Sequence, residues 1–168
     1  GEVAARQKST ETERALQDLN RDYHDAIDSL VSGFALTSRD NIILAINKPL
    51  AGVTGFDPQY FIGQPMRCLI EAILPFFELF EGEPVEQTEA WVEKITSLMA
   101  KSTGKSIEVR MITGEWILIT LDPTSLGGQS AVSTDISPQK RVEEALRKSE
   151  VHFRTLVENH PLPAILVD

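Results

Sequence analysis

The chain has 168 residues, 42% of them hydrophobic and 24% charged, which suits one globular domain with its own core. Its formal net charge of −9, with basic residues dispersed along the chain, argues against nucleic acid as a partner, since that would require a basic patch. No run of about 18 residues is free of charge and mostly apolar, so no segment is expected to span or contact a membrane.

The N-terminal part of the chain predicts a helix with one narrow apolar face. Residues 1–10 are polar and aperiodic, and we expect them to be frayed. From residue 11 to residue 30, apolar side chains recur at helical spacing, at Leu16, Leu19, Tyr23, Ala26 and Leu30. This face fits either a partner helix in a homodimer or the outer face of the chain's own sheet, where Trp116 and Leu118 would otherwise be exposed. The sequence leaves both possibilities open.

The next segment predicts a β-hairpin followed by helices. Residues 34–37 and 42–46 are apolar runs on either side of a Ser-Arg-Asp-Asn turn, because Asp and Asn tolerate the backbone conformations of tight turns. Glycines and prolines then interrupt the chain up to residue 66, which is typical of short helical turns joined by loops. Two longer helices are predicted, over residues 68–80 with a kink at Pro75 and over residues 88–101.

The C-terminal half predicts three strands and a long helix. Residues 106–112, 116–121 and 129–134 are β-like runs separated by glycine turns. Ser137 and Pro138 form a helix start, with the serine as the expected N-terminal cap. The helix that follows carries a coiled-coil pattern that favours parallel homodimerisation, at Val142, Leu146, Ser149, Phe153 and Leu156. Pro161 ends this helix, and residues 164–167 are expected to begin another strand.

This order of elements resembles the PAS fold, an α+β fold with a five-stranded antiparallel sheet and helices over one face, here flanked by N-terminal and C-terminal helices. The local signatures are the turn Asp40-Asn41 with Asn47 after the second strand, the hairpin Gly114-Glu115-Trp116, and the tripeptide Asp135-Ile136-Ser137. The tripeptide is similar to the Asp-Ile-Thr that often ends a PAS domain. The resemblance assigns residues 25–137 to a PAS sensor domain and residues 1–24 to an N-terminal flanking helix.

The residues after the domain resemble the linkers between tandem PAS domains in bacterial sensor histidine kinases and diguanylate cyclases. Residues 143–159 match the helix of such linkers, so residues 138–159 are assigned to a coiled-coil linker and residues 160–168 to the truncated start of a second PAS domain. The resemblance implies a cytoplasmic sensory module, as in two-component systems, with a downstream effector domain in the same chain. In this interpretation Asp135, Ile136 and Ser137 relay a signal from strand to helix. A membrane anchor elsewhere in the parent protein is left open.

The inner face of the predicted sheet either encloses a small-molecule cavity or is filled by its own side chains. The candidate pocket residues are Asn47, Phe77, Trp91, Arg110 and Ile119, with Asn47 and Arg110 as the polar contacts. A filled core would instead give a ligand-free module that only dimerises or spaces its neighbours. A third possibility, a small cone-shaped α+β enzyme, lacks the interior Asp, His or Tyr that such an enzyme needs as a base.

No catalytic, haem, flavin or metal site is expected. The three histidines, His24, His152 and His160, lie outside the predicted core, where a haem-binding PAS domain would need its axial ligand. The lone cysteine, Cys68, lacks the sequence surroundings found in flavin-binding light sensors of the superfamily. A single thiol also excludes an intrachain disulfide and fits a reducing compartment. Metal-ligand spacings of Cys and His are absent from the sequence.

Overall fold

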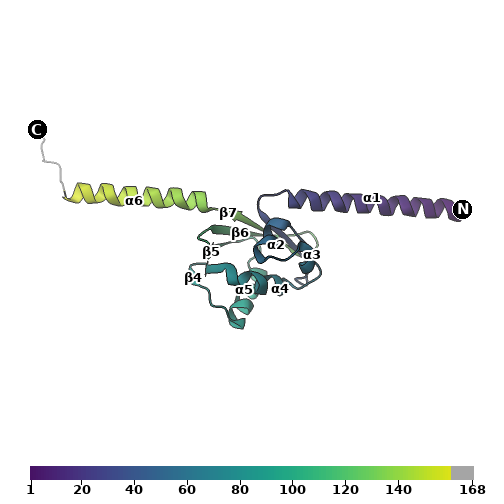
Figure 1. The fold of residues 1–168 in the computed structure, drawn as a ribbon, viewed down its shortest axis with the longest axis horizontal. Coiled ribbons are helices and arrows are strands. Elements are labelled where there is room, and N and C mark those ends of the chain that lie inside the picture. The colour runs from purple at the N-terminus through teal and green to yellow at the C-terminus, as the bar shows by residue number, and fades with distance from the viewer. Residues whose placement is uncertain (160–168) are drawn as a thin grey trace, which may run out of the picture.

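A seven-stranded antiparallel sheet forms the centre of the computed structural model, which describes residues 1–159. Short helices cover one face of this sheet, and one long helix projects at each end of the domain (Figure 1). In chain order the elements are α1 (Glu2–Asp28), β1 (Gly33–Thr37), β2 (Ile43–Ile46), α2 (Lys48–Thr54), α3 (Pro58–Phe61), α4 (Met66–Ile73), the 3-10 helix η1 (Leu74–Phe76), β3 (Phe77–Phe80), β4 (Glu83–Pro84), α5 (Glu89–Lys101), β5 (Ser106–Met111), β6 (Trp116–Pro123), β7 (Gln129–Asp135) and α6 (Ser137–Asn159).

Five of the strands are those expected from the sequence. They lie side by side in the order β2-β1-β7-β6-β5, and each neighbouring pair is antiparallel. In the turn between β1 and β2, Asn41 adopts a φ of 65°, a left-handed conformation that Asn tolerates better than most residues. The α+β fold predicted from the resemblance to PAS domains is therefore confirmed.

Beyond β5 the sheet continues with a β3–β4 hairpin that was not predicted. The helix expected over residues 68–80 ends at Ile73, Pro75 lies in η1, and the backbone is extended from Phe77 onward. Proline inside a helix removes one hydrogen bond and clashes with the preceding turn, so the helix stops instead of kinking. β3 then pairs with β5 and hydrogen-bonds the backbone groups along the outer edge of that strand, which would otherwise be unpaired. The helical prediction for residues 77–80 is wrong.

The core lies between the helices and the inner face of the sheet. Because side chains alternate along a strand, the pairs Ile119–Ser133 and Leu121–Ala131 on β6 and β7 face the helices together. Leu121 is fully buried there, and Ile95 of α5 belongs to the same core and has no exposed surface. Burial of this kind stabilises the fold by about 1.5–3 kcal/mol for each large apolar side chain.

The two long helices project in opposite directions from the domain (Figure 1). α1 begins at Glu2, so the prediction that residues 1–10 are frayed is wrong. Ile27, near the end of α1, is the buried residue of this helix, and none of the residues of α6 is buried. α1 therefore does not cover the outer face of its own sheet, where Trp116 and Leu118 lie half-buried.

Within the described part of the chain, none of the helices is both long and apolar enough to cross a membrane. The expected strand at residues 164–167 and the expected start of a second domain at residues 160–168 lie outside the described residues.

Candidate functional site

The joint between β7 and α6 is held by hydrogen bonds to the neighbouring strand β6. The amide of Ile136 donates to the Trp116 carbonyl oxygen over 2.8 Å, and the Trp116 amide donates to the Ser137 hydroxyl oxygen over 2.9 Å. Asp135 Oδ1 accepts from the Ser137 amide over 2.8 Å. The side chain that caps the first turn of α6 is thus the carboxylate of Asp135, whereas the Ser137 hydroxyl, predicted as the cap, binds the strand.

A lysine on the first turn of α6 adds a second attachment. Lys140 Nζ lies 3.0 Å from a carboxylate oxygen of Glu108 and 4.8 Å from the ring centroid of Trp116. Arg110 lies against the same ring, with its guanidinium carbon 5.7 Å from the centroid. A cation over an indole ring contributes about 0.5–1 kcal/mol at a partly exposed site. The start of α6 is therefore tied to β5 and β6 by an ion pair, a cation–π contact and hydrogen bonds.

The pKa of the Asp135 carboxyl group is lowered by its hydrogen-bond donors. Hydrogen bonds from the side chain and then the backbone of Ser137 lower its pKa below the ordinary value of 3.8, and the charge of Arg141 contributes further. Asp135 is exposed to solvent, so the effect comes from these donors and not from burial. At neutral pH the joint carries a full negative charge.

At the joint where α1 enters the domain, Asn47 connects α1, β1 and α2. Its side-chain oxygen accepts from the amides of Phe34 and Leu50 over 2.9 and 3.2 Å. Its side-chain nitrogen donates to the carbonyl oxygens of Ile27 and Ser32 over 2.8 and 2.9 Å. The residue has no exposed surface and no unused hydrogen-bonding group. Asn47 is thus a structural junction at which α1 enters the domain.

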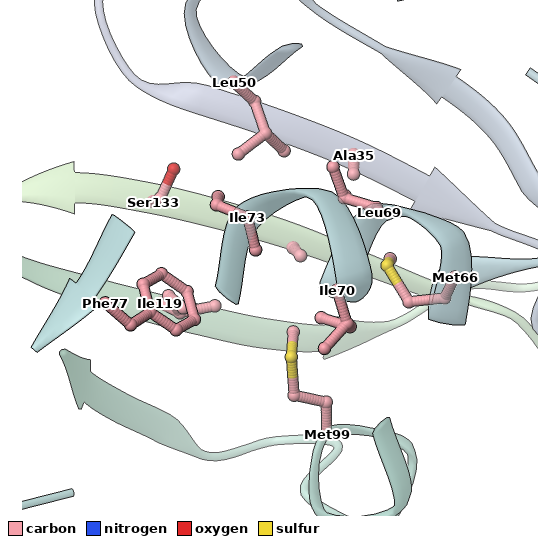
Figure 2. Close-up of a pocket in the computed structure, with 11 residues that line it drawn as sticks. Ala35, Leu50, Met66, Leu69, Ile70, Ile73, Phe77, Met99, Ile119 and Ser133 are labelled. Atoms are coloured by element: carbon pink, nitrogen blue, oxygen red, sulfur yellow. The ribbon is translucent and has the colours of Figure 1, made fainter. Parts of the chain in front are cut away.

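An apolar inner cavity lies between α4 and the sheet, as Figure 2 shows. Its volume is about 40 Å³, room for no more than a few water-sized groups. Ile70 and Ile73 of α4 and Phe77 of β3 face Ile119 of β6 across it, and Met99 of α5 closes it from the side (Figure 2). Most of the space beneath the helices is therefore filled by side chains.

A larger cavity of about 240 Å³, called the outer cavity because exposed residues such as Val31 line it, lies beside the inner one. The two cavities share part of their lining, at Leu50, Ile73, Phe77, Ile119 and Ser133. At its mouth the outer cavity is lined by Val31 and Gly33, where the chain passes from α1 into β1, and by Asp135, where it passes from β7 into α6. One cavity thus touches both joints through which the long helices connect to the domain.

Of the predicted pocket residues, the structure brings Phe77 and Ile119 together in the cavities and places the other three elsewhere. The side chain of Asn47 is occupied by the backbone, as described above. Arg110 lies on the opposite face of the sheet, 3.5 Å from Glu78, because its strand neighbours Val109 and Met111 take the inward positions. Trp91 packs at the edge of the core, with Lys94 Nζ 4.4 Å from its ring.

Sequence reasoning missed most of the cavity lining, including Leu50, Ser133 and Glu115. The alternation of β7 signalled that Ser133 shares a face with Ala131. The positions of Leu50 and Glu115 depend on how α2 and the β5–β6 turn fold over the cavity mouth, for which the sequence carries no local signal.

The sequence predicted a row of apolar residues along each long helix, and these rows, here called the seams, are exposed in the structure. The exposed fractions on α1 range from 39% for Tyr23 to 66% for Leu19, with Leu16 between them, and Leu30, just after the end of α1, is also exposed. On α6 they range from 46% for Leu156 to 68% for Val142 and Phe153, with Leu146 between them. Eight apolar side chains in two rows are thus free to meet other surfaces.

Neither histidine nor cysteine lines either cavity. His24 lies on α1 next to Tyr23, His152 lies on α6, and His160 is outside the described residues. Cys68 is a half-buried free thiol on α4. Among residues 1–159, no cluster of three or more His, Cys, Asp or Glu side chains is arranged to hold a metal ion.

Comparison with known proteins gives the family. The chain is similar in structure to the PAS domain of BvgS from Bordetella pertussis, with 10% identity, a TM-score of 0.45, and coverage of 80% of this chain and 98% of that one. It is also similar to the PAS domain of an HTR-like protein from Haloarcula marismortui, with 14% identity, a TM-score of 0.42, and coverage of 76% and 99%. A third similar structure is the PAS domain of the quorum-sensing receptor RpfR from Cronobacter turicensis in complex with BDSF, with 17% identity, a TM-score of 0.41, and coverage of 66% and 99%.

With TM-scores below 0.5, these structural likenesses carry no argument by themselves. No curated protein matches the chain. A family model described as the PAS fold matches residues 27–144, which is most of the chain. PAS domains form a family of sensory and signalling modules, and this chain belongs to that family.

Proposed function

We propose that this chain is a cytoplasmic, non-catalytic sensory module that passes the state of its cavity through α6 to a downstream effector domain. The observation that carries the proposal is the position of the outer cavity, which is lined by both helix joints. A small molecule bound there would contact Val31 and Gly33 on one side and Asp135 on the other. Binding that favours one of two packings of the sheet against the helices would shift the population toward that packing.

The route from cavity to helix runs through β6 and β7. Ile117 and Ile119 line the outer cavity, and their partners across the ladder are Asp135 and Ser133. A displacement of β6 therefore moves the end of β7 and, through the hydrogen bonds of Trp116 to the joint, the first turn of α6. Because α6 makes few other contacts with the domain, a small rotation at the joint becomes a larger movement at its far end.

The same proposal includes a parallel homodimer. Both long helices carry exposed apolar seams, and they extend in opposite directions from the domain (Figure 1). Parallel pairing of two copies along these seams would bury the apolar rows and keep both joints close to the dimer axis. We propose that the effector is a histidine kinase or a diguanylate cyclase, because residues 143–159 resemble the linkers of those proteins.

A ligand-free spacer module is the second candidate, and the small inner cavity favours it. With only about 40 Å³ of free volume beneath α4, the core is close to filled without a guest. Native mass spectrometry of the purified chain separates the two candidates. A retained or added small molecule supports sensing, whereas a dimer that never takes up a ligand supports the spacer.

The relay is tested by Asp135→Ala in the full-length protein, with effector activity as the readout. Removing the carboxylate takes away the cap of α6, so we expect effector activity to stop responding to the signal while the domain remains folded. Asp122→Ala, which removes another exposed carboxylate at the far end of β6, is the matched control and should leave the response intact. A response that survives Asp135→Ala unchanged would show that the joint is not the relay.

A further inference from the structure

The outer cavity is polar at its mouth and apolar deeper inside. The proposed sensing role alone does not require this difference. Two carboxylates, Glu115 and Asp135, line its mouth, and the Ser133 hydroxyl lies where the outer and inner cavities meet. The deeper walls are hydrocarbon, including Phe77 and Ile119. Lysine, arginine and histidine do not occur among the residues that line either cavity.

Both carboxylates remain available for a ligand. In the described part of the chain neither carboxylate forms a salt bridge. The charge of Arg141 lowers the pKa of Asp135, but it is the smallest of the causes that lower this pKa. Asp135 already accepts hydrogen bonds from Ser137, and a carboxylate can accept several hydrogen bonds at once. A ligand bearing hydrogen-bond donors would therefore find acceptors at the mouth.

We infer that the cavity binds a small amphiphile with a cationic head, such as a protonated primary amine on a short alkyl or arylalkyl chain. This inference rests on the proposed sensing function and specifies its ligand class. The apolar part lies against Phe77 and Ile119, and the ammonium group lies between Glu115 and Asp135. An anionic head in the same place would meet two negative charges without a lining cation, which is unfavourable at short range.

The size of the cavity limits the ligand. A volume of 240 Å³ corresponds to about eight water molecules of liquid volume and lies below the usual range of about 300–1,000 Å³ for small-molecule sites. A chain of about six carbons with one amino group matches this space. Larger ring cofactors would require the helices to move apart.

The charge of the head group is tested with three ligands of equal length, n-hexylamine, n-hexanol and n-hexanoate, titrated into the chain by calorimetry at neutral pH. We expect hexylamine to bind about tenfold more tightly than hexanoate, with hexanol between them, because charge-assisted hydrogen bonds form only with the amine. Glu115→Gln should weaken hexylamine binding about five- to tenfold and leave hexanol binding unchanged. Glu86→Gln, an exposed glutamate outside the cavity, should change neither.

The outcomes separate this inference from the function on which it rests. Binding of hexanoate that equals or exceeds that of hexylamine overturns the cationic head and leaves a ligand sensor in place. Failure of all three ligands to bind overturns the inference and favours the ligand-free spacer. Ile119→Phe, which adds bulk inside the cavity, should abolish binding of all three, and hexylamine binding that persists in this variant would place the amine elsewhere and refute the site.

Discussion

Asn47→Ala should be among the most destabilising single substitutions in this domain. The side chain is completely buried and makes four hydrogen bonds, two as acceptor from the amides of Phe34 and Leu50 and two as donor to the carbonyl oxygens of Ile27 and Ser32. Alanine leaves all four backbone groups without this partner in a region that water reaches poorly.

The expected loss follows from these four groups. A typical hydrogen bond contributes about 0.5–1.5 kcal/mol, and a buried group left unsatisfied costs about 1–3 kcal/mol. Because Phe34, Leu50 and Ser32 are only partly buried, and water can replace part of the loss there, we expect a decrease of about 3–5 kcal/mol in the free energy of unfolding. This is a large part of the 5–15 kcal/mol that stabilises a typical domain.

Urea denaturation followed by circular dichroism measures this change. Asn20→Ala, at an exposed position of α1, is the matched control and should leave stability unchanged or slightly raised, since alanine is the better helix former. A loss below about 1 kcal/mol for Asn47→Ala would show that water or neighbouring groups replace the side chain, and the assignment of Asn47 as the junction of α1, β1 and α2 would be refuted.

Three further predictions concern the joint and the β6–β7 turn. Lys140→Ala removes an ion pair and a cation–π contact, so amide exchange in the first turn of α6 should become about fivefold faster, corresponding to about 1 kcal/mol. Gly128→Ala would place a Cβ atom 1.9 Å from the Thr37 carbonyl oxygen and should destabilise the domain by about 3 kcal/mol in urea denaturation. Because the pKa of Asp135 is lowered in the folded state, its stabilisation is present above pH 3.8 and disappears as the pH falls through the lowered value, so the stability difference between wild type and Asp135→Ala should shrink there.

Each of these predictions has a control or an outcome that contradicts it. Lys148→Ala, further along α6, should leave exchange at the joint unchanged, and equal effects of the two lysines would refute the attachment. Gly52→Ala, where a Cβ atom meets no neighbour within 4 Å, should be neutral or stabilising inside α2. A stability difference for Asp135→Ala that stays constant down to pH 3 would show that the charge of the carboxylate does not hold the joint.

Sequence patterns predicted the strands whose signals are local. Alternation and turn residues located β1, β2, β5, β6 and β7. Phe77-Glu78-Leu79-Phe80 is a short apolar run that fits helix or strand equally, and pairing with β5 decides its conformation. That decision depends on contacts between distant parts of the chain, so the hairpin β3–β4 could not be predicted.

The candidate site was predictable only in part for the same reason. Ile119 follows from the inward alternation of β6, and Phe77 from its apolar character. Asn47 could be recognised as the end of a strand, but its partners Ile27 and Ser32 lie far from it in the sequence. Glu115 and Asp135 meet at the mouth of the outer cavity because the antiparallel register brings the start of β6 beside the end of β7.

The link between the cavity and α6 can be measured directly as a distance. Spin labels at Lys101→Cys on α5 and Lys148→Cys on α6, in a Cys68→Ser background diluted with unlabelled protein, report the orientation of α6 relative to the domain by double electron–electron resonance. Filling the cavity from within by Ile119→Phe should shift the distance distribution, whereas Leu118→Phe, the same added bulk on the outer face of β6, should not. Superimposable distributions for wild type and Ile119→Phe would mean that the state of the cavity does not reach the helix.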